Sequence, residues 1–280
     1  MIIPSLEGRT LTKAHGAGND FILVPDFDGR LDISAADVAA ICDRHRGLGA
    51  DGLIRVVRTA SVSDAADSAD AEWFMDYRNA DGSKAEMCGN GVRVFVHYLR
   101  IQGIVPLGPG DAVDVATRGG VKSVSFDGEL YTVDMGPYLE EGTVTVTVPG
   151  VGTRTGRSVA MPNPHVVVVV DQVELDAADF HATPTYDPQP IDGTNLELVV
   201  PAEVSRMRVL ERGVGETLAC GTGTCAVAVE LLALRGESDG VVDIESPGGR
   251  LSVRLEGGRA YLTGPAVLVA EATLVGIAGY

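Results

Sequence analysis

This sequence contains an internal repeat, which limits the folds that it can adopt. The stretch CGNGVRVFVHYLR begins at Cys88, and the stretch CGTGTCAVAVELLALR begins at Cys220. Each consists of a cysteine, a Gly-x-Gly turn and an apolar run that lacks glycine and proline and is long enough for a buried helix. Gly103 and Gly236 follow the two runs, where glycine typically ends a helix. The sequence therefore predicts two matching helices, each preceded by a cysteine.

The repeat extends to the segments around these helices. Residues 113–137 and 242–265 both read as strand, Gly-Gly turn, alternating strand, glycine turn, strand and Gly-Pro. Such alternation is typical of half-buried strands joined as hairpins. Upstream, Asn19 and Asn163 each precede a β-branched strand. We therefore expect an α/β fold of two pseudo-symmetric duplicated domains. Each would be a β-rich mixed sheet wrapped around a central helix, with the active site in the cleft between them.

The repeat also predicts where the two halves divide. A boundary near Gly136 and Pro137 gives an N-terminal half of residues 1–137 and a C-terminal half of residues 138–265. The final segment, residues 266–280, has no counterpart in the repeat and could complete the N-terminal half. Residues 59–71 are small and acidic, and we expect them to form a mobile surface loop with no assigned function.

The amino-acid composition narrows the classes of molecule that this protein is expected to bind. A net charge of −17 repels phosphate backbones and anionic lipid, so neither nucleic acid nor a membrane is an expected partner. No apolar run approaches the roughly eighteen residues of a spanning helix, and no signal peptide is recognised. The four cysteines, Cys42, Cys88, Cys220 and Cys225, include no CxxC pair. We therefore expect no disulfide framework, no metal site and a cytoplasmic location.

A cysteine directly before a helix has distinctive chemistry. Unpaired N–H groups and the helix dipole favour negative charge there, which lowers the pKa of a thiol. Duplication would set two such thiols facing each other across a pseudo-twofold axis. One could remove a proton from a carbon while the other returns a proton to the opposite face, without a cofactor. Amides at the two helix starts could hold the substrate carboxylate: Gly89, Asn90, Gly221 and Thr222.

Several motifs together resemble the diaminopimelate epimerase family, over essentially the whole chain. They are KAHGAGNDF (13–21), RGLGADG (46–52), YRNADGSKAEMCGNGVR (77–93), PNPH (162–165), TNLE (194–197) and ERGVGETLACGTGT (211–224). The resemblance implies that the chain is an isomerase that interconverts LL- and meso-2,6-diaminopimelate for lysine and peptidoglycan precursor synthesis. It also implies a small-molecule substrate, no cofactor and a possible homodimer.

The resemblance also assigns roles to residues. It makes Cys88 and Cys220 the acid/base pair, and it makes His165 and Glu211 the groups that modulate their pKa values. The substrate-binding residues that it implies are Asn19, Asn79, Gly89, Asn90, Asn163, Asn195, Glu211, Arg212, Gly221 and Thr222. Asparagine can donate to a carboxylate and accept from an ammonium group, and Arg212 suits the carboxylate at the far end of the substrate.

Two alternatives stay open at this point. A proline racemase or hydroxyproline epimerase would share the fold and the two-cysteine chemistry, although its first motif usually has histidine where this chain has Asn90. A non-catalytic thiol protein, such as a redox sensor, would not need the asparagines and the arginine. We expect Cys42, in ADVAAICDRH, and Cys225, inside the second helical run, to be buried core residues.

Overall fold

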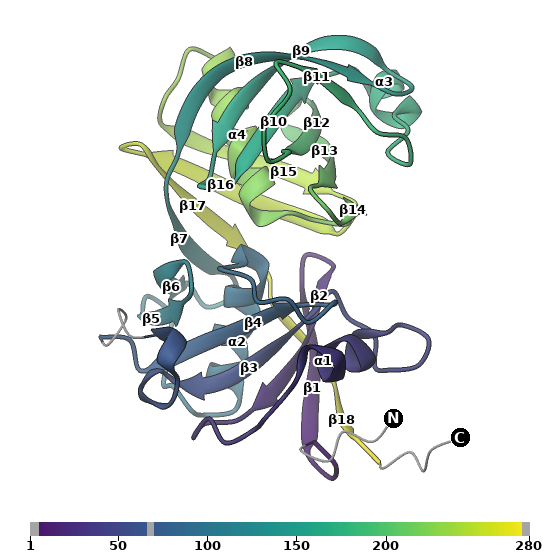
Figure 1. The fold of residues 1–280 in the computed structure, drawn as a ribbon. Coiled ribbons are helices and arrows are strands. Elements are labelled where there is room, and N and C mark those ends of the chain that lie inside the picture. The colour runs from purple at the N-terminus through teal and green to yellow at the C-terminus, as the bar shows by residue number, and fades with distance from the viewer. Residues whose placement is uncertain (1–5, 66–69, 276–280) are drawn as a thin grey trace. The chain divides into compact units, whose positions relative to one another are not determined.

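The computed structural model describes residues 6–65 and 70–275. The polypeptide divides into two compact units (Figure 1). Unit 1 comprises the residues up to Val133 together with those from Pro265 onward, and unit 2 comprises Asp134–Gly264. Both units are rich in sheet and contain few helices. Within the described residues, no helix is long and apolar enough to cross a membrane.

Unit 1 is a mixed sheet packed on one long helix, α2 (Gly89–Ile101). Its strands are β1 (Thr10–Gly16), β2 (Asn19–Pro25), β3 (Gly52–Arg58), β4 (Trp73–Asn79), β5 (Ala112–Thr117), β6 (Gly120–Phe126), β18 (Val267–Thr273) and β7 (Tyr131–Pro137), which leads the chain into unit 2. They pair in the order β18-β1-β2-β3-β4-β5-β6-β7. The β2–β3 and β4–β5 pairs are parallel and the others are antiparallel. A shorter helix, α1 (Ala35–Cys42), contacts β3.

Unit 2 repeats this arrangement around the helix α4 (Gly221–Leu234). Its strands are β8 (Leu139–Val148), β9 (Gly152–Ala160), β10 (Pro164–Val169), β12 (Asn195–Val200), β13 (Val204–Glu211), β15 (Gly240–Ser246), β16 (Gly249–Glu256) and β17 (Arg259–Gly264). They pair in the order β8-β9-β10-β12-β13-β15-β16-β17, and only β10–β12 and β13–β15 are parallel among these pairs. The smaller elements are α3 (Gln172–Ala177), β11 (Thr185–Asp187) and β14 (Gly215–Thr217).

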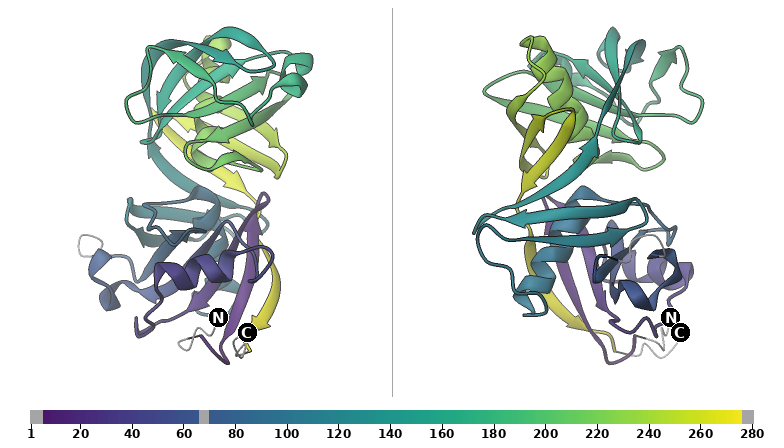
Figure 2. Two further views of the ribbon diagram at one scale, coloured as in Figure 1. Left: turned by 45° about the vertical axis from the view of Figure 1, so that its right-hand side comes forward. Right: turned by 90° about the vertical axis from the view of Figure 1, so that its left-hand side faces the viewer.

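The two units match strand for strand in order and direction. Each has two antiparallel pairings, then a parallel, an antiparallel and a second parallel pairing, and finally two more antiparallel pairings. In unit 1 the place that β8 has in unit 2 is taken by β18, which pairs with β1 from Thr10 opposite Thr273 to His15 opposite Val267. Figure 2 shows β18 in yellow beside β1 in purple. The predicted α/β fold of two duplicated halves, each with a central helix, is confirmed.

Local sequence explains why the two long helices form and stop where they do. Their apolar runs are buried, with Phe95 and Leu99 of α2 and Cys225 of α4 inaccessible to solvent. Gly103 and Gly236 lie just beyond the helix ends with φ of +67° and +73°, in the left-handed region where a Cβ is unfavourable. Both predicted helix stops are therefore confirmed.

The remaining expectations about the core and the acidic loop have different outcomes. Cys42 and Cys225 are both buried, as expected. Burial raises the pKa of Cys42 to about 12, so this thiol is chemically inert at neutral pH. In the segment predicted to be a mobile loop, η1 (Thr59–Ser61) and η2 (Ser63–Ala65) are short 3-10 turns, and residues 66–69 lie outside the described part of the chain.

Candidate active site

Cys88 and Cys220 occupy equivalent positions in their units. Each is the N-cap residue of its long helix and has an extended backbone, with φ of −142° and ψ of 119° for Cys88 and φ of −124° and ψ of 117° for Cys220. In both helices the amide three residues later, of Gly91 or Gly223, donates a hydrogen bond to the sulfur at 3.4 Å. The expectation that each of these cysteines begins a helix is confirmed.

The first turn of each helix presents its amides at the same end as the sulfur. In α2 the first intrahelical bond runs from the Val92 amide to the Cys88 carbonyl, and the equivalent bond in α4 has the same length of 2.9 Å. The amides that precede these bonds belong to the residues predicted to hold a carboxylate, namely Gly89, Asn90, Gly221 and Thr222. A helix start of this kind favours an anion through its N–H groups and its dipole.

In unit 1 the structure brings three of the predicted residues together. The Cys88 thiol donates to Oδ1 of Asn19 at 3.5 Å, and Nδ2 of Asn90 donates to the same oxygen at 3.4 Å. Asn79, at the end of β4, instead uses Nδ2 to donate to the Ser83 hydroxyl at 3.0 Å within the following turn. We call Asn19, Asn79, Cys88, Gly89 and Asn90 the N-terminal half-site.

A charged cluster that sequence reasoning did not assign fixes Asn19. Asp51, for which no substrate contact was predicted, accepts from Nδ2 of Asn19 at 2.8 Å. Arg44 donates to the carboxylates of both Asp20 and Asp51, and Lys13 donates to Asp20. Although burial acts to raise the pKa of Asp20, the hydrogen bonds from Arg44 and Lys13 hold it well below its usual range. The cluster therefore orients the asparagine that contacts the Cys88 thiol.

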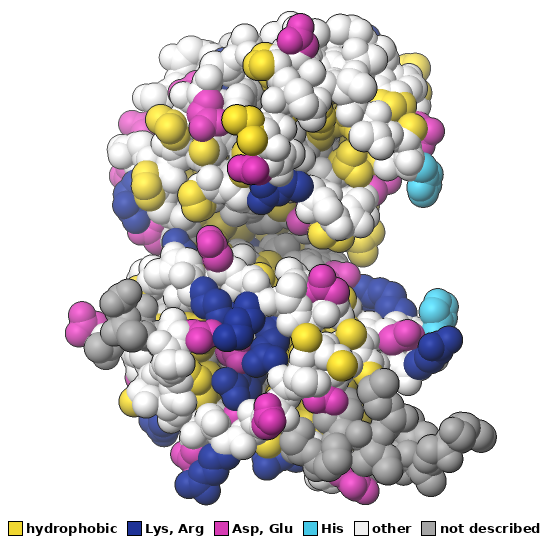
Figure 3. All heavy atoms as spheres, viewed as in Figure 1, with side chains coloured by type: hydrophobic (Ala, Val, Ile, Leu, Met, Phe, Trp, Pro, Cys, Tyr) yellow, Lys and Arg dark blue, Asp and Glu magenta, His cyan; other side chains and the backbone are white. Residues whose placement is uncertain are grey.

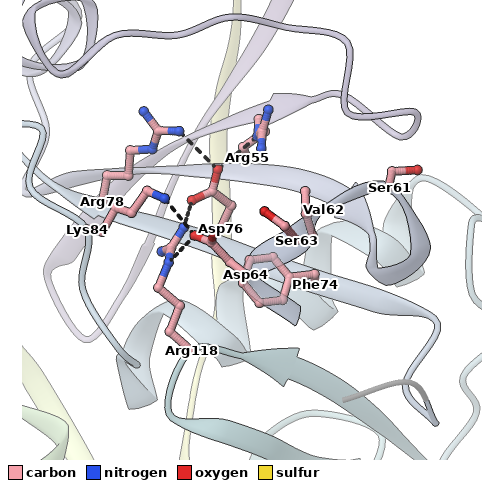
Figure 4. A pocket seen from close by; sticks show the side chains of 10 residues that line it. All are labelled: Arg55, Ser61, Val62, Ser63, Asp64, Phe74, Asp76, Arg78, Lys84 and Arg118. Atoms are coloured by element: carbon pink, nitrogen blue, oxygen red, sulfur yellow. Dashed lines mark hydrogen bonds and ion pairs between the residues drawn. The ribbon is translucent and has the colours of Figure 1, made fainter. Parts of the chain in front are cut away.

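A second network supports the loop that leads from β4 to Cys88. Arg118 donates from Nη1 to the backbone carbonyls of Tyr77, at 2.9 Å, and Ala85, at 3.4 Å. Its Nε donates to Asp64 at 2.9 Å, and Lys84 pairs with the same carboxylate at 2.7 Å. Arg118 therefore ties the loop at Ala85, three residues before Cys88, to Tyr77 near the end of β4. Figure 4 shows the Arg118 side chain with Asp64, Lys84 and Asp76.

The carboxylate at the centre of this network is Asp76, which is only 1% exposed. It accepts from Arg55 at 2.8 Å, from Arg78 at 3.3 Å and from Arg118. Burial acts to raise the pKa of Asp76, but the three arginines hold it below its usual value. These groups line a cavity of about 250 Å³, and Figure 3 shows basic side chains gathered over β3 and β4.

In unit 2 the predicted residues form a more closely bonded group. Nδ2 of Asn195 donates to the Pro164 carbonyl at 2.9 Å, and its Oδ1 accepts from the Arg212 amide at 2.9 Å. Asn195 thus fastens the starts of β10 and β12 to the end of β13. The Arg212 guanidinium donates to the Asp192 carbonyl at 3.0 Å. We call the following the C-terminal half-site: Asn163, His165, Asn195, Glu211, Arg212, Cys220, Gly221 and Thr222.

Asn163 links His165 to the start of α4. Its Oδ1 lies 3.2 Å from Nε2 of His165, and its Nδ2 donates to the Thr222 hydroxyl at 3.4 Å. The same hydroxyl lies 3.4 Å from the Cys220 sulfur. On β13, Glu211 accepts a hydrogen bond from the Thr217 hydroxyl. The structure therefore connects Asn163, His165 and Cys220 through a chain of polar contacts.

One prediction about the thiols is wrong for Cys220. A helix start favours a thiolate, and the sequence therefore indicated a lowered pKa, but the pKa of Cys220 is raised well above its usual value. The cause is first the burial of the thiol, which is 7% exposed, and then the charges of Glu211 and Glu197. Hydrogen bonds from Thr222 and Gly223 act in the opposite direction without overcoming them.

Sequence reasoning assigned no role to Glu197, which lies against His165 of the C-terminal half-site. It lies on β12 with 0% exposure and is 2.7 Å from Nδ1 of His165, which is also fully buried. The signal in the sequence was a carboxylate with apolar residues on both sides in the strand NLELVV. Buried carboxylates are rare unless they are paired or functional, so this residue could have been singled out.

Comparison with solved structures defines the class of fold. A phenazine biosynthesis protein of the PhzF family from Enterococcus faecalis superposes with a TM-score of 0.67 at 13% identity, covering 94% of this chain and 97% of that one. A hydroxyproline epimerase from Agrobacterium vitis, solved with bound trans-4-hydroxy-L-proline, gives a TM-score of 0.64 at 15% identity, covering 94% and 91%. This chain therefore has the same duplicated fold as these proteins.

Sequence comparison then identifies the family. The family model described as diaminopimelate epimerase matches residues 11–139 and 157–269. The diaminopimelate epimerase of Rhodococcus jostii is 46% identical over 281 residues, covering 94% of this chain and 96% of that protein. The diaminopimelate epimerase of Streptomyces coelicolor is 48% identical over 276 residues, covering 92% and 93%. This chain belongs to the diaminopimelate epimerase family, and the resemblance seen in its motifs is confirmed.

Proposed function

We propose that this chain interconverts LL- and meso-2,6-diaminopimelate by moving one proton at an α-carbon between two cysteines. The observation that carries the proposal is the equivalence of Cys88 and Cys220. Each caps the long helix of its own unit and accepts the amide of the third residue of that helix at the same distance. Within this family, two matched thiols provide the two bases that inversion of a stereocentre requires.

The proton transfer balances without any other reactant. The thiolate of one cysteine takes the α-proton, and the electron pair of the broken C–H bond stays on the substrate as a carbanion. The thiol of the other cysteine then donates its proton to the opposite face of the carbon. The two sulfurs exchange protonation states, so each serves as base in one direction. The proposal requires the two half-sites to flank one α-carbon, with the amides at both helix starts stabilising the negative charge that develops.

Recognition of the substrate falls to the polar side chains of both half-sites. Diaminopimelate has two amino-acid ends and only one reacts, so the other end must be bound specifically. We assign this role to Asn19, Asn79, Asn163, Asn195, Glu211 and Arg212. A guanidinium has five N–H donors, and the bond from Arg212 to the Asp192 carbonyl uses one of them. Arg212 is therefore suited to hold a distal carboxylate through two parallel hydrogen bonds.

The same assignment leads to proposals about the cofactor requirement, the location and the oligomeric state of the enzyme. We propose that the reaction uses no cofactor or metal, because both proton transfers are assigned to cysteines. We further propose a cytoplasmic enzyme of lysine and peptidoglycan precursor synthesis that acts as a homodimer. Its net charge of −17 fits a small-molecule substrate rather than a nucleic acid or membrane partner.

The test is incubation of the purified protein with LL-diaminopimelate in D₂O. We expect the meso isomer to form and the newly inverted α-carbon to carry deuterium, because the returning proton comes from a thiol that has exchanged with solvent. Chiral chromatography measures the isomers, and NMR or mass spectrometry measures the deuterium. A parallel incubation with L-proline separates the alternatives. Racemisation of proline without turnover of diaminopimelate would favour a proline racemase, and turnover of neither would remove the proposed activity.

A further inference from the structure

The two units differ in what lies beneath the first turn of the long helix. A Cβ placed on Gly91 of α2 would lie 3.4 Å from Cδ1 of Ile54 and 3.5 Å from Cζ of Phe21. A Cβ placed on Gly223, the equivalent residue of α4, would lie 2.4 Å from Oε1 of Glu197. The helix start that carries Cys88 therefore rests on apolar side chains, whereas the helix start that carries Cys220 rests on a carboxylate.

Strand register shows that these are equivalent positions of the duplicated fold. On the parallel pair β2–β3, Phe21 is opposite the residue two before Ile54. On the parallel pair β10–β12, His165 is opposite the residue two before Glu197. The pair Phe21 and Ile54 in unit 1 thus corresponds to the pair His165 and Glu197 in unit 2. One half of the duplication has an apolar pair where the other has two ionisable groups.

The Glu197–His165 pair is costly to bury and only partly satisfied. Both side chains are 0% exposed, and Nδ1 of His165 lies 2.7 Å from Oε1 of Glu197. The other carboxylate oxygen, Oε2, is buried and makes no hydrogen bond with any described residue. Burying an ionisable group with an unsatisfied oxygen is destabilising, and an apolar pair fills the same positions in unit 1. The presence of Glu197 at this position therefore calls for a functional reason.

We propose that Glu197 is a positioning residue that makes the two thiols unequal by keeping Cys220 protonated in the substrate-free enzyme. Its carboxylate lies at the start of α4 and opposes a second negative charge there, which removes the advantage that a helix start gives to a thiolate. His165 donates from Nδ1 to this carboxylate and holds it beneath Gly223. This inference rests on the proposed two-thiol function, because that mechanism needs one charged and one neutral sulfur.

The groups that act on Cys220 come from three strands. Burial raises the pKa of this thiol most, followed by the charge of Glu211 on β13 and then by the charge of Glu197 on β12. His165 on β10 reaches the same site through its bond to Glu197. Burial also raises the pKa of Cys220. The contribution of Glu197 to this pKa therefore has to be measured in a variant that removes the charge of Glu197 and keeps its shape.

The decisive variant is Glu197→Gln. It removes the negative charge, keeps an oxygen acceptor for His165 and changes the volume little. Iodoacetamide alkylation is measured over a range of pH, and mass spectrometry of the digested protein gives the rate at Cys88 and Cys220 separately. The midpoint of each rate–pH profile reports the pKa of that thiol independently of its accessibility. In the wild-type protein, we expect the Cys220 midpoint to lie above that of Cys88.

In Glu197→Gln, we expect the Cys220 midpoint to move to lower pH. A fall of about one pKa unit would raise the alkylation rate at a fixed lower pH about tenfold. Glu230→Gln is the matched control, because Glu230 is a second largely buried glutamate of unit 2, on α4, and pairs with Arg157. This control should leave the Cys220 midpoint where it is. Thermal unfolding checks that both variants are folded.

Three results would overturn the inference. They are coincident midpoints for Cys88 and Cys220 in the wild-type protein, an unmoved Cys220 midpoint in Glu197→Gln, and an equal shift in the control. The first of these results is measured on the wild-type protein, so the proposal can be refuted even if a variant fails to fold. Alkylation also does not depend on turnover. Absence of diaminopimelate epimerisation would remove the proposed function and leave the measured difference between the thiols standing.

Discussion

A matched pair of substitutions tests the packing beneath the two helix starts. Gly91→Ala and Gly223→Ala add the same methyl group at equivalent positions of α2 and α4. At Gly91 the new carbon would meet Cβ of Cys88 at 3.3 Å and the flexible end of Ile54 at 3.4 Å. At Gly223 it would meet Oε1 of Glu197 at 2.4 Å and the carboxyl carbon at 3.1 Å. We expect the two variants to differ in stability although the chemical change is identical.

The size of the expected difference in stability between the two variants follows from these distances. Replacing glycine by alanine in a helix stabilises it by up to about 1 kcal/mol, and this gain is shared by both variants. In Gly223→Ala, Glu197 must move by roughly 1 Å to restore van der Waals separation. It has little room to do so, because it is 0% exposed and bonded to His165 at 2.7 Å. Overpacking of this kind costs about 1–3 kcal/mol. Gly223→Ala should therefore be less stable than Gly91→Ala by about 1–3 kcal/mol.

Differential scanning calorimetry of the two variants beside the wild-type protein measures this difference. At about 2–4 °C per kcal/mol for chains near this size, Gly223→Ala should melt several degrees below Gly91→Ala. Gly223→Ala should also shift the alkylation midpoint of Cys220, because it displaces Glu197. Gly91→Ala should leave that midpoint unchanged. Equal melting temperatures, or a higher one for Gly223→Ala, would show that Glu197 is not held tightly against α4 and would refute the reasoning.

Further predictions concern the site and its ionisable groups. Cys88→Ala and Cys220→Ala should each lower diaminopimelate epimerisation by several orders of magnitude, because each removes one of two bases. Cys225→Ala should mainly lower thermal stability, and near-normal turnover by Cys220→Ala would contradict the mechanism. Arg212→Ala should weaken calorimetric binding of a diaminopimelate analogue with little change in melting temperature; unchanged affinity would exclude it as the clamp. Dialysis against EDTA should leave turnover intact, and recovery only on adding a metal would argue for different chemistry. The pKa of Asp20 is held below its ordinary 3.8 by hydrogen bonds that outweigh burial, so its stabilisation is complete above that pH and is lost as pH falls below it. Asp20→Asn should flatten the acid side of the stability–pH curve, and an unchanged acid side would refute this.

What the sequence predicted well was local. The apolar runs after Cys88 and Cys220 and the glycines that stop them specify the two helices without help from the rest of the chain. The alternating hairpins and their repetition predicted the duplicated α/β fold. The structure places Asn19 and Asn90 at Cys88, and their role in binding substrate stays a prediction. That both thiols face one substrate carbon stays a prediction.

The features that the sequence did not predict depend on which residues, far apart in the sequence, lie next to each other in the fold. Glu197 comes beneath α4 because β12 lies parallel to β10 in one particular register, and Asp51 reaches Asn19 because β3 lies parallel to β2. No local pattern encodes such a register. The raised pKa of Cys220 was missed for a related reason: the helix start could be recognised in the sequence, whereas the burial of the sulfur could not.

The strand β18 has a consequence for how the protein is made. Unit 2 is one uninterrupted stretch of chain, so all its residues are available once Gly264 has left the ribosome. Unit 1 is built from residues synthesised before unit 2 and from a strand synthesised after it, because β18 pairs with β1. During translation β1 therefore keeps an unpaired outer edge until β18 has been synthesised, and such edges invite association with other chains. The N-terminal part of this protein should complete its fold after the C-terminal part, in the reverse of the order of synthesis.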